Sequence, residues 1–435
     1  MSIKQTLFLA YKFLTSSNSD KALFRHIKGS IIGIALSLVP LVVVLEVTDG
    51  MISGITRRYI ELGSYHFQAR TSRVSNIDYN KVVNDIKEIN DVENAFFYIQ
   101  ETCLVYTVSG RLGVSIRGLP ENIYEEDKML REYLVFTDGE FILDNESILL
   151  SSTIAEKINA KVGDEVKILT AYTPPGRPVI LRPARFILKG IFTTGYRELD
   201  EISAYIQYNR AYSIFRDMNP PFIGIKVKDP YKNIDGTAAI IRNAISPGFF
   251  VHSWYRLNFT LYKSLEVTKK LLLFIMILIL CVASINISST MIMMVLSMRK
   301  EIAILKSIGF SQKNIAFTFL LTGFGIGVVG SFIGMFAGIF MSIHINIIIQ
   351  FVEKIINVFL FAGYYLINIL KHTDYMVSAF SIMSSGYYLE EIPVMLDYKE
   401  LVLVFCVSLL LSVAASFLPA YRAGSIRPIE ILQKS

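Results

Sequence analysis

Histidine and cysteine, the residues that most often bind metals or act as nucleophiles, are few and scattered in this chain. Its 435 residues include five histidines and three cysteines: His26, His66, His252, His344, His372, Cys103, Cys281 and Cys406. None of them has the spacing of a metal site or of a C-x-x-C redox pair. The phosphate-binding pattern G-x-x-x-x-G-K-[ST] and the nucleophile pattern G-x-S-x-G do not occur. The sequence therefore predicts no catalytic site, no cofactor and no metal ion on this chain.

A short charged run between two long apolar stretches could form a contact surface. Its candidate contact residues are Arg299, Lys300, Glu301, Ile304, Leu305, Ile308 and Gly309. Ile304 and Ile308 are one helical turn apart, which would give a short helix an apolar face. Gly309 is a typical helix stop, and Ser311 can cap the helix that follows. The residues alone leave two interpretations open: an ordinary hairpin at the membrane surface, or a coupling helix that docks into a cytoplasmic partner.

Small residues recur at helical spacing in the next apolar stretch. They are Gly323, Gly327, Gly330, Gly334 and Gly338. Such spacing lets helices approach closely inside a membrane, so it predicts a face packed against other helices. The helices packed against this face could belong to a second subunit. Polar residues that could hydrogen-bond to neighbouring helices are Ser284, Asn286, Ser288, Ser289 and Thr290.

Charged residues are unevenly distributed along the chain, and the stretches that lack them predict its membrane-spanning helices. Hydrophobic residues make up 52% and charged residues 18%, below the roughly 25% of soluble domains. Four stretches have no Asp, Glu, Lys or Arg: Ser30–Leu45, Leu271–Met298, Asn314–Val352 and Leu401–Tyr421. About 20 apolar residues suffice to cross a bilayer. The first stretch could instead be the apolar core of a signal peptide, but no small-x-small cleavage site follows, which favours an uncleaved anchor.

Basic residues gather on one side of these four predicted spans. They precede the first span, fill the loop between the second and third, and follow the fourth, which places all three segments in the cytoplasm. The formal net charge of +6 is therefore membrane-flank charge, and it predicts no nucleic-acid binding. Glu46 is at the outer end of the first span. A carboxylate there is a functional candidate, although a side chain that snorkels to the interface is an equal alternative.

The third stretch is too long for a single crossing. As one helix, its 39 residues would extend about 58 Å, so it must protrude, tilt or break. Ile355–Leu370 is a further apolar segment and could be a fifth span. A fifth span would put the basic tail outside, so we expect an interfacial helix instead.

The extracytoplasmic segment predicts a mixed α/β domain. Helical spacing covers Tyr79–Ile89, and alternating β-branched runs follow it with glycines between them. It has one cysteine, so no internal disulfide can form. The predicted fold class is membrane α-helical, with four transmembrane helices and a large mixed α/β domain. The expected order is cytoplasmic 1–26, span 27–47, external domain 48–265, span 266–298, cytoplasmic coupling helix 299–313, span 314–350, external loop 351–400, span 401–421 and cytoplasmic tail 422–435.

Two motifs near the ends of the helical part resemble a known family. Arg299–Ser311 is similar to the loop of FtsX/MacB-type ABC permeases, with a basic pair, E-I-x-x-L-K and a terminal glycine. Leu418–Leu432 resembles the closing signature of that family, P-A-x-R-A followed by I-x-P. The order of elements agrees along essentially the whole chain. The resemblance favours the coupling-helix interpretation and implies a MacB-like permease architecture.

Within that family the chain looks most like the lipoprotein-releasing permeases of the LolC/LolE type. Val162–Val166 resembles the turn before their protruding hook hairpin, near 170–186, and Phe186–Phe192 resembles the returning strand. The resemblance implies that Thr173, Pro174, Pro175, Gly176 and Arg177 form the hook tip that holds a periplasmic carrier. It also suggests Lys167 and Arg185 as a basic pad for that carrier.

The resemblance implies a permease subunit of the bacterial inner membrane that is not itself an enzyme. Its expected partners are a LolD-like ATPase that binds ATP and magnesium, a second permease in a homo- or heterodimer, a LolA-like carrier, membrane lipid, and triacylated lipoproteins extracted from the outer leaflet. Two other functions are open: a MacB-type peptide or drug exporter, and an FtsX-like transmitter of signals across the membrane. The segment Ile356–Met376 is longer than in the common lipoprotein-releasing permeases, and the resemblance assigns it no role.

Overall fold

The computed structural model describes residues 6, 8–12, 21–71, 78–172, 178–215, 218–245, 248–371 and 392–426. It divides the chain into two compact units. The helical unit comprises Met1–Met51, Leu265–Gly363 and Ile392–Ser435, and the sheet unit comprises Ile52–Ser264 and Tyr364–Glu391. Each unit has its own buried apolar core.

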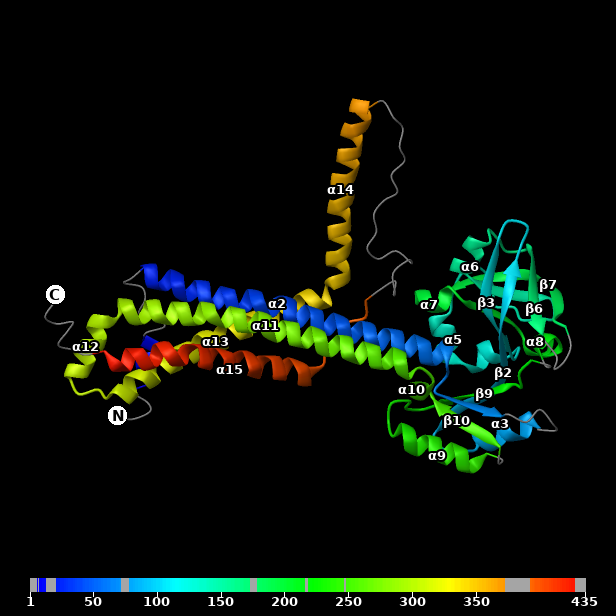
Figure 1. Ribbon diagram of the computed structural model, residues 1–435, viewed down its shortest axis with the longest axis horizontal. Helices are drawn as coiled ribbons and strands as arrows, with labels where there is room; N and C mark the ends of the chain where they lie inside the picture. The colour runs from blue at the N-terminus through cyan, green and yellow to red at the C-terminus, as the bar shows by residue number, and fades with distance from the viewer. Residues whose placement is uncertain are drawn as a thin grey trace. The chain divides into compact units, whose positions relative to one another are not determined.

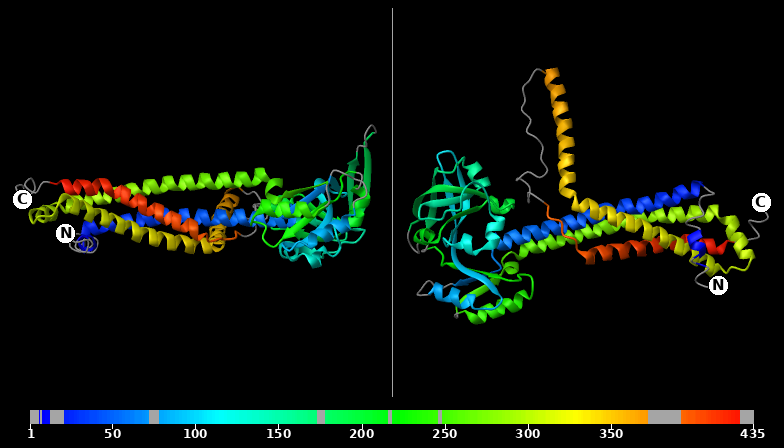
Figure 2. Two further views of the ribbon diagram at one scale, coloured as in Figure 1. Left: turned by 90° about the horizontal axis from the view of Figure 1, so that it is seen from below. Right: turned by 180° about the vertical axis from the view of Figure 1, so that it is seen from behind.

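Four long helices lie side by side in the helical unit (Figures 1 and 2). They are α2 (Lys21–Arg58), α11 (Phe259–Ser297), α13 (Gln312–Ile343) and α15 (Tyr398–Ser425). A short helix, α12 (Arg299–Ser307), lies between α11 and α13 in the chain. The core of the unit is apolar along its length, from Leu41 and Leu45 of α2 to Phe319 of α13.

A fifth helix, α14 (Ile345–Lys371), is also long and apolar enough to cross a membrane, so the candidate spans number five rather than the four predicted. The charge-free stretch breaks at His344, and α13 therefore ends seven residues before the predicted limit of 350. Figure 1 shows α14 leaving the bundle at this break. The Asn346 side chain accepts a hydrogen bond from the Ile392 amide and donates one to its carbonyl, both at 3.2 Å. The chain between these residues thus starts and returns at one point of the bundle, as the four-span arrangement requires.

Among its described residues, the sheet unit has ten strands with short helices around them. The strands are β1 (Phe67–Thr71), β2 (Val92–Tyr106), β3 (Arg111–Leu119), β4 (Val135–Gly139), β5 (Ser147–Ser151), β6 (Glu165–Tyr172), β7 (Ile180–Thr193), β8 (Ser203–Gln207), β9 (Phe222–Val227) and β10 (Phe249–Ser253). The helices are the π-helical turn η2 (Tyr59–Gly63), α3 (Tyr79–Lys87), α4 (Ile123–Glu126), α5 (Lys128–Tyr133), α6 (Ser152–Lys157), α7 (Arg197–Asp200), α8 (Tyr208–Phe215), α9 (Ile234–Ala244) and α10 (Trp254–Leu257). The predicted mixed α/β domain is confirmed.

Four strands form an antiparallel layer in the order β10-β1-β9-β2. Helices α3 and α9 supply apolar side chains to its core: Val83 and Ile86 from α3 and Ile241 from α9 pack with Phe67 and Ile225 of the strands. The 2-residue period of the strands directs these apolar side chains to one face, where the helices bury them. Asp78 caps α3 by accepting hydrogen bonds from the amides of the next turn.

Strand β2 is long enough to leave this layer and enter a second one. Its first half pairs with β9, whereas Ile99–Tyr106 pairs with β3. The pairings then continue from β3 to β8, β5, β7 and β6, and β6 returns to β2. Six strands thus close into a ring around an apolar core that includes Ile116, Ile148, Ile168 and Phe186. Closure pairs the strand edges that an open sheet would expose.

Candidate functional site

Helix α12 carries the predicted contact residues, and both of its flanks have recognisable stop and start signals. Gly309 has a φ of +103°, a left-handed conformation that glycine adopts without steric cost. The amides of Gly309 and Phe310 donate to the carbonyls of Lys306 and Leu305, which satisfies the helix end. The Ser311 hydroxyl accepts the Asn314 amide at 3.3 Å and caps α13. The chain therefore ends one helix and begins the next within four residues.

The two faces of α12 differ in their surroundings. Ile302 and Ala303 are fully buried, and Ile302 belongs to the core of the helical unit. Ile304 and Ile308 are 51% and 71% exposed. Lys306 donates from Nζ to the Ile426 carbonyl at 2.7 Å, which joins α12 to the end of α15. The helix is therefore fixed on one face and presents an apolar surface on the other.

The remaining predicted residues of α12 lie at its ends and along its border. Arg299, Lys300 and Glu301 are exposed in the first turn, and Leu305 is partly buried against the core of the helical unit. An acidic residue in the first turn complements the positive end of the helix dipole. The structure therefore places five of the predicted residues on α12, and the other two, Ile308 and Gly309, directly after its last residue.

The glycines of α13 face other helices of this same chain. A Cβ on Gly323 would lie 1.9 Å from Ser416 Oγ, and one on Gly327 would lie 2.2 Å from Ser412 Oγ, both in α15. The other three contact α2: a Cβ on Gly330, Gly334 or Gly338 would lie 3.0 Å, 2.8 Å or 2.7 Å from Ile34 Cβ, Leu38 Cβ or Val42 Cβ. These contacts show the five glycines packed against helices of the same chain, and a contact with a second subunit stays a prediction.

Serines of α15 complement the glycines across the α13 contact. Ser412 donates from Oγ to the Gly323 carbonyl at 3.0 Å, and Ser331 and Ser408 share a hydrogen bond of 2.7 Å between their hydroxyl oxygens. In α2, Ser30 is likewise bonded to the Thr290 hydroxyl of α11. Close approach and interhelical hydrogen bonds are the two forces that hold helices together in lipid.

Glu46 is buried between helices rather than directed to the surface. Its side chain is 2% exposed, so it does not snorkel, and among the described residues its Oε2 has no hydrogen-bond partner. Nearby, Lys269 of α11 lies 2.5 Å from Asp49 Oδ1 and 2.6 Å from Glu400 Oε1. These ion pairs join α2, α11 and α15 at one level of the helical unit.

The predicted hook corresponds to the antiparallel hairpin of β6 and β7. Its pairing continues as far as Tyr172 and Ile180, and the tip residues Thr173, Pro174, Pro175, Gly176 and Arg177 lie outside the described residues. Next to the tip, Val179 and Leu181 are 57% and 60% exposed. Exposed apolar side chains on a projecting ribbon are typical of a contact surface. They were not predicted, although the run Pro178–Leu181 is itself a sequence signal.

Lys167 and Arg185 lie directly opposite each other in the hairpin. Glu165 lies between them, with Oε1 3.5 Å from Lys167 Nζ and 3.7 Å from Arg185 Nε. Glu165 and Arg185 also line an open hollow of about 630 Å³, with Arg210 of α8 on another wall. The predicted pad is therefore a mixed-charge surface beside a hollow, and exposed ion pairs of this kind are individually weak.

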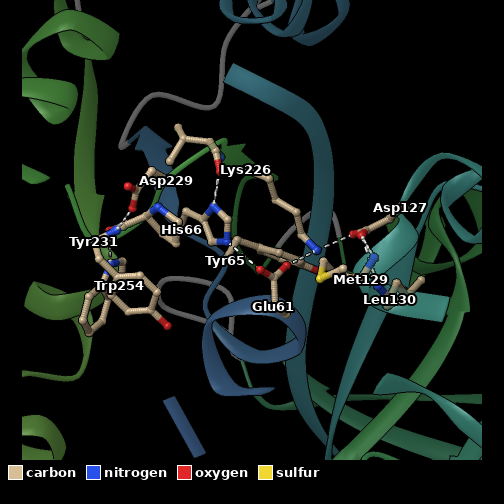
Figure 3. Close-up of polar contacts among 12 residues, drawn as sticks. Glu61, Tyr65, His66, Asp127, Met129, Leu130, Lys226, Asp229, Tyr231 and Trp254 are labelled. Carbon is tan, nitrogen blue, oxygen red and sulfur yellow. Dashed lines mark hydrogen bonds and ion pairs between the residues drawn. The ribbon is translucent and has the colours of Figure 1, made fainter. Parts of the chain in front are cut away.

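A buried cluster of charges that the sequence did not reveal lies where α2 ends (Figure 3). Lys226 of β9 is 2.7 Å from Glu61 Oε2 and 2.5 Å from Asp127 Oδ2. Glu61 Oε1 lies 2.9 Å from His66 Nε2. On the other side of the ring, His66 Nδ1 lies 2.9 Å from the amide nitrogen and 3.1 Å from the carbonyl oxygen of Val227. We call Glu61, His66, Lys226 and Asp127 the charge cluster.

Each member of the charge cluster comes from a different local feature. Glu61 is in the π-helical turn η2, His66 precedes β1, and Asp127 caps α5 by accepting from the Met129 and Leu130 amides. The Lys226 side chain is 4% exposed. Buried charges of this kind persist only when they are paired and hydrogen-bonded. The cluster therefore fixes the end of α2 to β9 and to α5 within the sheet unit.

Comparison with known proteins agrees with this arrangement. Residues 273–428 match the family described as FtsX-like permease C-terminal. The lipoprotein-releasing system transmembrane protein LolC of Neisseria meningitidis serogroup B is 26% identical over 411 residues, 93% of each chain. LolE of Haemophilus influenzae is 21% identical over 439 residues, 98% of each chain. This chain is thus similar over most of its length to lipoprotein-releasing system transmembrane proteins.

As a lipoprotein-releasing permease relative, the chain is a multi-pass protein of the bacterial inner membrane with its large domain in the periplasm. Among solved structures, the periplasmic region of MacB from Actinobacillus actinomycetemcomitans covers 48% of this chain and 94% of its own length, at 10% identity. The TM-score of that match is 0.29. Helix α12 follows α11, which ends at Ser297, and its location on the cytoplasmic side stays a prediction of the charge pattern.

Proposed function

We propose that this chain is the permease subunit of an ABC transporter that extracts lipoproteins from the outer leaflet of the inner membrane. ATP is hydrolysed on a partner subunit, and the lipoprotein passes to a periplasmic carrier. The observation that carries the proposal is the similarity to LolC over 93% of the chain, together with a hairpin in the periplasmic domain and an apolar surface on α12.

Helix α12 is the proposed contact with the ATPase. Ile304 and Ile308 give it an apolar surface, and the burial of Ile302 fixes it to the helical unit. An element that is fixed on one face and docked on the other can transmit a displacement of its partner to the helices that it joins. The ATP and Mg²⁺ of the transporter would be bound by that partner, which resembles LolD in this proposal.

The β6–β7 hairpin is the proposed contact with the carrier. Its tip residues supply two prolines, which fix the backbone, and Arg177, which can pair with a carboxylate of a partner. Val179 and Leu181 add apolar area beside the tip, and Lys167 and Arg185 add charge at its base. The partner is a soluble LolA-like carrier with an acidic and apolar surface.

Extraction of lipid requires a source of free energy and a shielded receiver. Exposing acyl chains to water costs about 0.8 kcal/mol per CH₂, so three chains cost far more than thermal energy supplies. A triacylated lipoprotein is therefore moved by ATP-driven displacement and received in an apolar cavity of the carrier. A second permease, identical or related, completes the transporter.

The two alternative functions differ from lipoprotein release in the contact surfaces that they require. A MacB-type exporter or an FtsX-like transmitter would use the same α12 surface but no carrier-binding hairpin. The length of β6 and β7 and the apolar residues beside the tip favour the lipoprotein-releasing function.

The deciding experiment replaces Pro174, Pro175 and Arg177 with Ala in the assembled transporter and measures carrier-dependent release of lipoproteins from spheroplasts. We expect release and carrier crosslinking to be lost while basal ATPase activity is unchanged. The matched control replaces Val108, Ser109 and Arg111 with Ala, in and beside the turn between β2 and β3. The transporter with this control variant should release lipoproteins at the normal rate. Normal release by the hairpin variant would refute the carrier-binding role and favour the two alternatives.

A further inference from the structure

The cytoplasmic end of the helical unit contains a small hollow that the proposed function does not use. Its volume is about 200 Å³, and α11, α12 and α15 all contribute to its lining. Arg299 of α12 and Arg422 of α15 supply charge, whereas Ile292 and Leu296 of α11 and Pro419 of α15 supply apolar walls. Basic and apolar groups therefore meet in one enclosed place.

The two arginines are available to a ligand. Within the described residues, neither Arg299 nor Arg422 has an acidic partner, and no acidic residue lines the hollow. The nearby cation Lys306 is already engaged by the Ile426 carbonyl. In addition, no side chain caps the N-terminus of α12, where the helix dipole is positive. Two like charges at one hollow with no carboxylate between them favour an anionic ligand.

The position and size of the hollow restrict the class of anion. It lies where the apolar part of α11 ends on the cytoplasmic side, which is the depth of lipid headgroups. The cytoplasmic leaflet is rich in anionic lipids, and basic pockets between helices on that side bind their headgroups. A volume of about 200 Å³ is below the ~300–1,000 Å³ of sites that enclose a whole small molecule. It suits a phosphate and the first part of a glycerol, with chains that continue outside.

We infer that this hollow binds the phosphate of an anionic phospholipid of the cytoplasmic leaflet. Arg299 and Arg422 hold the phosphate oxygens, because a guanidinium offers paired donors that match phosphate geometry. Ile292 and Leu296 contact the start of the acyl chains, which a free phosphate could not exploit. The lipid would join the end of α15 to the start of α12. This inference does not depend on which substrate the transporter moves.

The test uses the full chain in nanodiscs of phosphatidylcholine that contain a small fraction of photoactivatable phosphatidylglycerol. We expect crosslinks to peptides containing residues 292–299 and 419–426. Arg422→Gln should reduce crosslinking by more than about 5-fold, because a basic residue that is merely near the surface contributes about 1 kcal/mol, which is about 5-fold. Leu296→Trp, which fills the hollow and keeps both charges, should have a similar effect. Arg422→Lys, which keeps the charge but lacks the paired donors, should lose less crosslinking than Arg422→Gln.

Two matched controls and one competitor distinguish the alternatives. Lys313→Gln removes an exposed cation of the same side, and Leu278→Trp enlarges a different exposed residue of α11; both should crosslink like the unmodified chain. Soluble glycerol phosphate should not displace the lipid. Equal losses in Arg422→Gln and Lys313→Gln would overturn the inference in favour of general surface charge. Displacement by glycerol phosphate would overturn it in favour of a free-phosphate site.

Discussion

Lys226 lies in a strand of apolar residues, and the two carboxylates beside it explain why it is tolerated there. Glu61 and Asp127 contact its ammonium group inside the sheet unit. Removing one partner of a buried charge pair leaves the others without compensation, which is far more costly than losing an exposed ion pair. The stability of the sheet unit should therefore depend on this one side chain.

We predict that Lys226→Met lowers the free energy of unfolding of the sheet unit by about 3–5 kcal/mol, because two buried carboxylates lose their cation. The single tryptophan, Trp254, is buried in the sheet unit and reports its unfolding by fluorescence. Lys232→Met is the control, since Lys232 is exposed, and it should change stability by less than about 0.5 kcal/mol. Equal effects of the two substitutions would show that the charge cluster does not stabilise the fold.

Cys103 gives a second test at a single position. Burial, with a contribution from the Glu101 carboxylate, raises the pKa of the Cys103 thiol to about 12. The thiol thus remains protonated and unreactive at neutral and mildly alkaline pH. We predict no maleimide labelling of Cys103 in the folded protein at pH 8 and full labelling after denaturation, measured by mass spectrometry. Labelling of the folded protein at the rate of an exposed thiol would contradict the buried position.

The charge cluster could not be predicted from the sequence because its members are far apart along the chain and meet only in the folded structure. Glu61 and Lys226 are 165 residues apart, and His66 lies in no recognisable motif. A lysine inside the run Phe222–Val227 was the available signal, since a buried lysine needs a partner. Its partner could not be named without the strand order that brings β9 to the end of α2.

Among the elements, helices and long alternating strands were the most predictable. Spacing predicted α3 to within two residues of its end, and the resemblance placed the returning strand Phe186–Phe192 within β7. Strand β8 was missed because every residue in it is buried, so the two-residue alternation that marks a strand is lost. The closing pair of the ring, β6 with β2, was equally unpredictable, since it joins residues about sixty positions apart.

Helix α12 supports a prediction about coupling. Ile304→Asp and Ile308→Asp should abolish ATPase-driven release while the periplasmic domain stays folded, because a charge in a docked apolar face must be buried without a partner. Both residues are exposed in the chain itself, so folding should be spared. Transport and ATPase co-purification are the measurements, and Ile308→Leu is the control that should keep both. Normal transport in both Asp variants would refute the coupling role and show that this segment is an ordinary hairpin at the membrane surface.

The glycines of α13 support a prediction about packing. Gly334→Val should destabilise the helical unit by about 1–3 kcal/mol, since the added atoms meet the backbone of α2, with Ala35 O 2.8 Å from the new Cβ. Gly363→Val in α14 is the matched control, because a Cβ there meets nothing within 4 Å. Thermal unfolding in detergent compares the two. Equal unfolding temperatures would mean that α13 and α2 do not pack as described.

For the molecule as a whole, the four-span arrangement can be tested by thiol labelling. Ser307→Cys should react only from the cytoplasmic side and Gly176→Cys only from the periplasmic side, in a background without the native cysteines. The return of the chain at Asn346 and Ile392 also predicts that a thiol at Lys371 is not labelled from the cytoplasm. Cytoplasmic labelling at Lys371 would establish α14 as a crossing helix and overturn the interfacial assignment.

The closed ring of six strands has a consequence for how this protein can diverge. Pairing of β6 with β2, and of β7 with β5, fixes the base of the hairpin in register. Beyond Leu169, the residues Thr170–Tyr172 pair with β7 alone among the described strands. Thr170 is still buried, but substitutions at the exposed positions Ala171, Ile180 and Leu181 should therefore disturb the fold of the domain little. The hairpin can change with its partner from one lineage to another, while selection on stability acts on the ring.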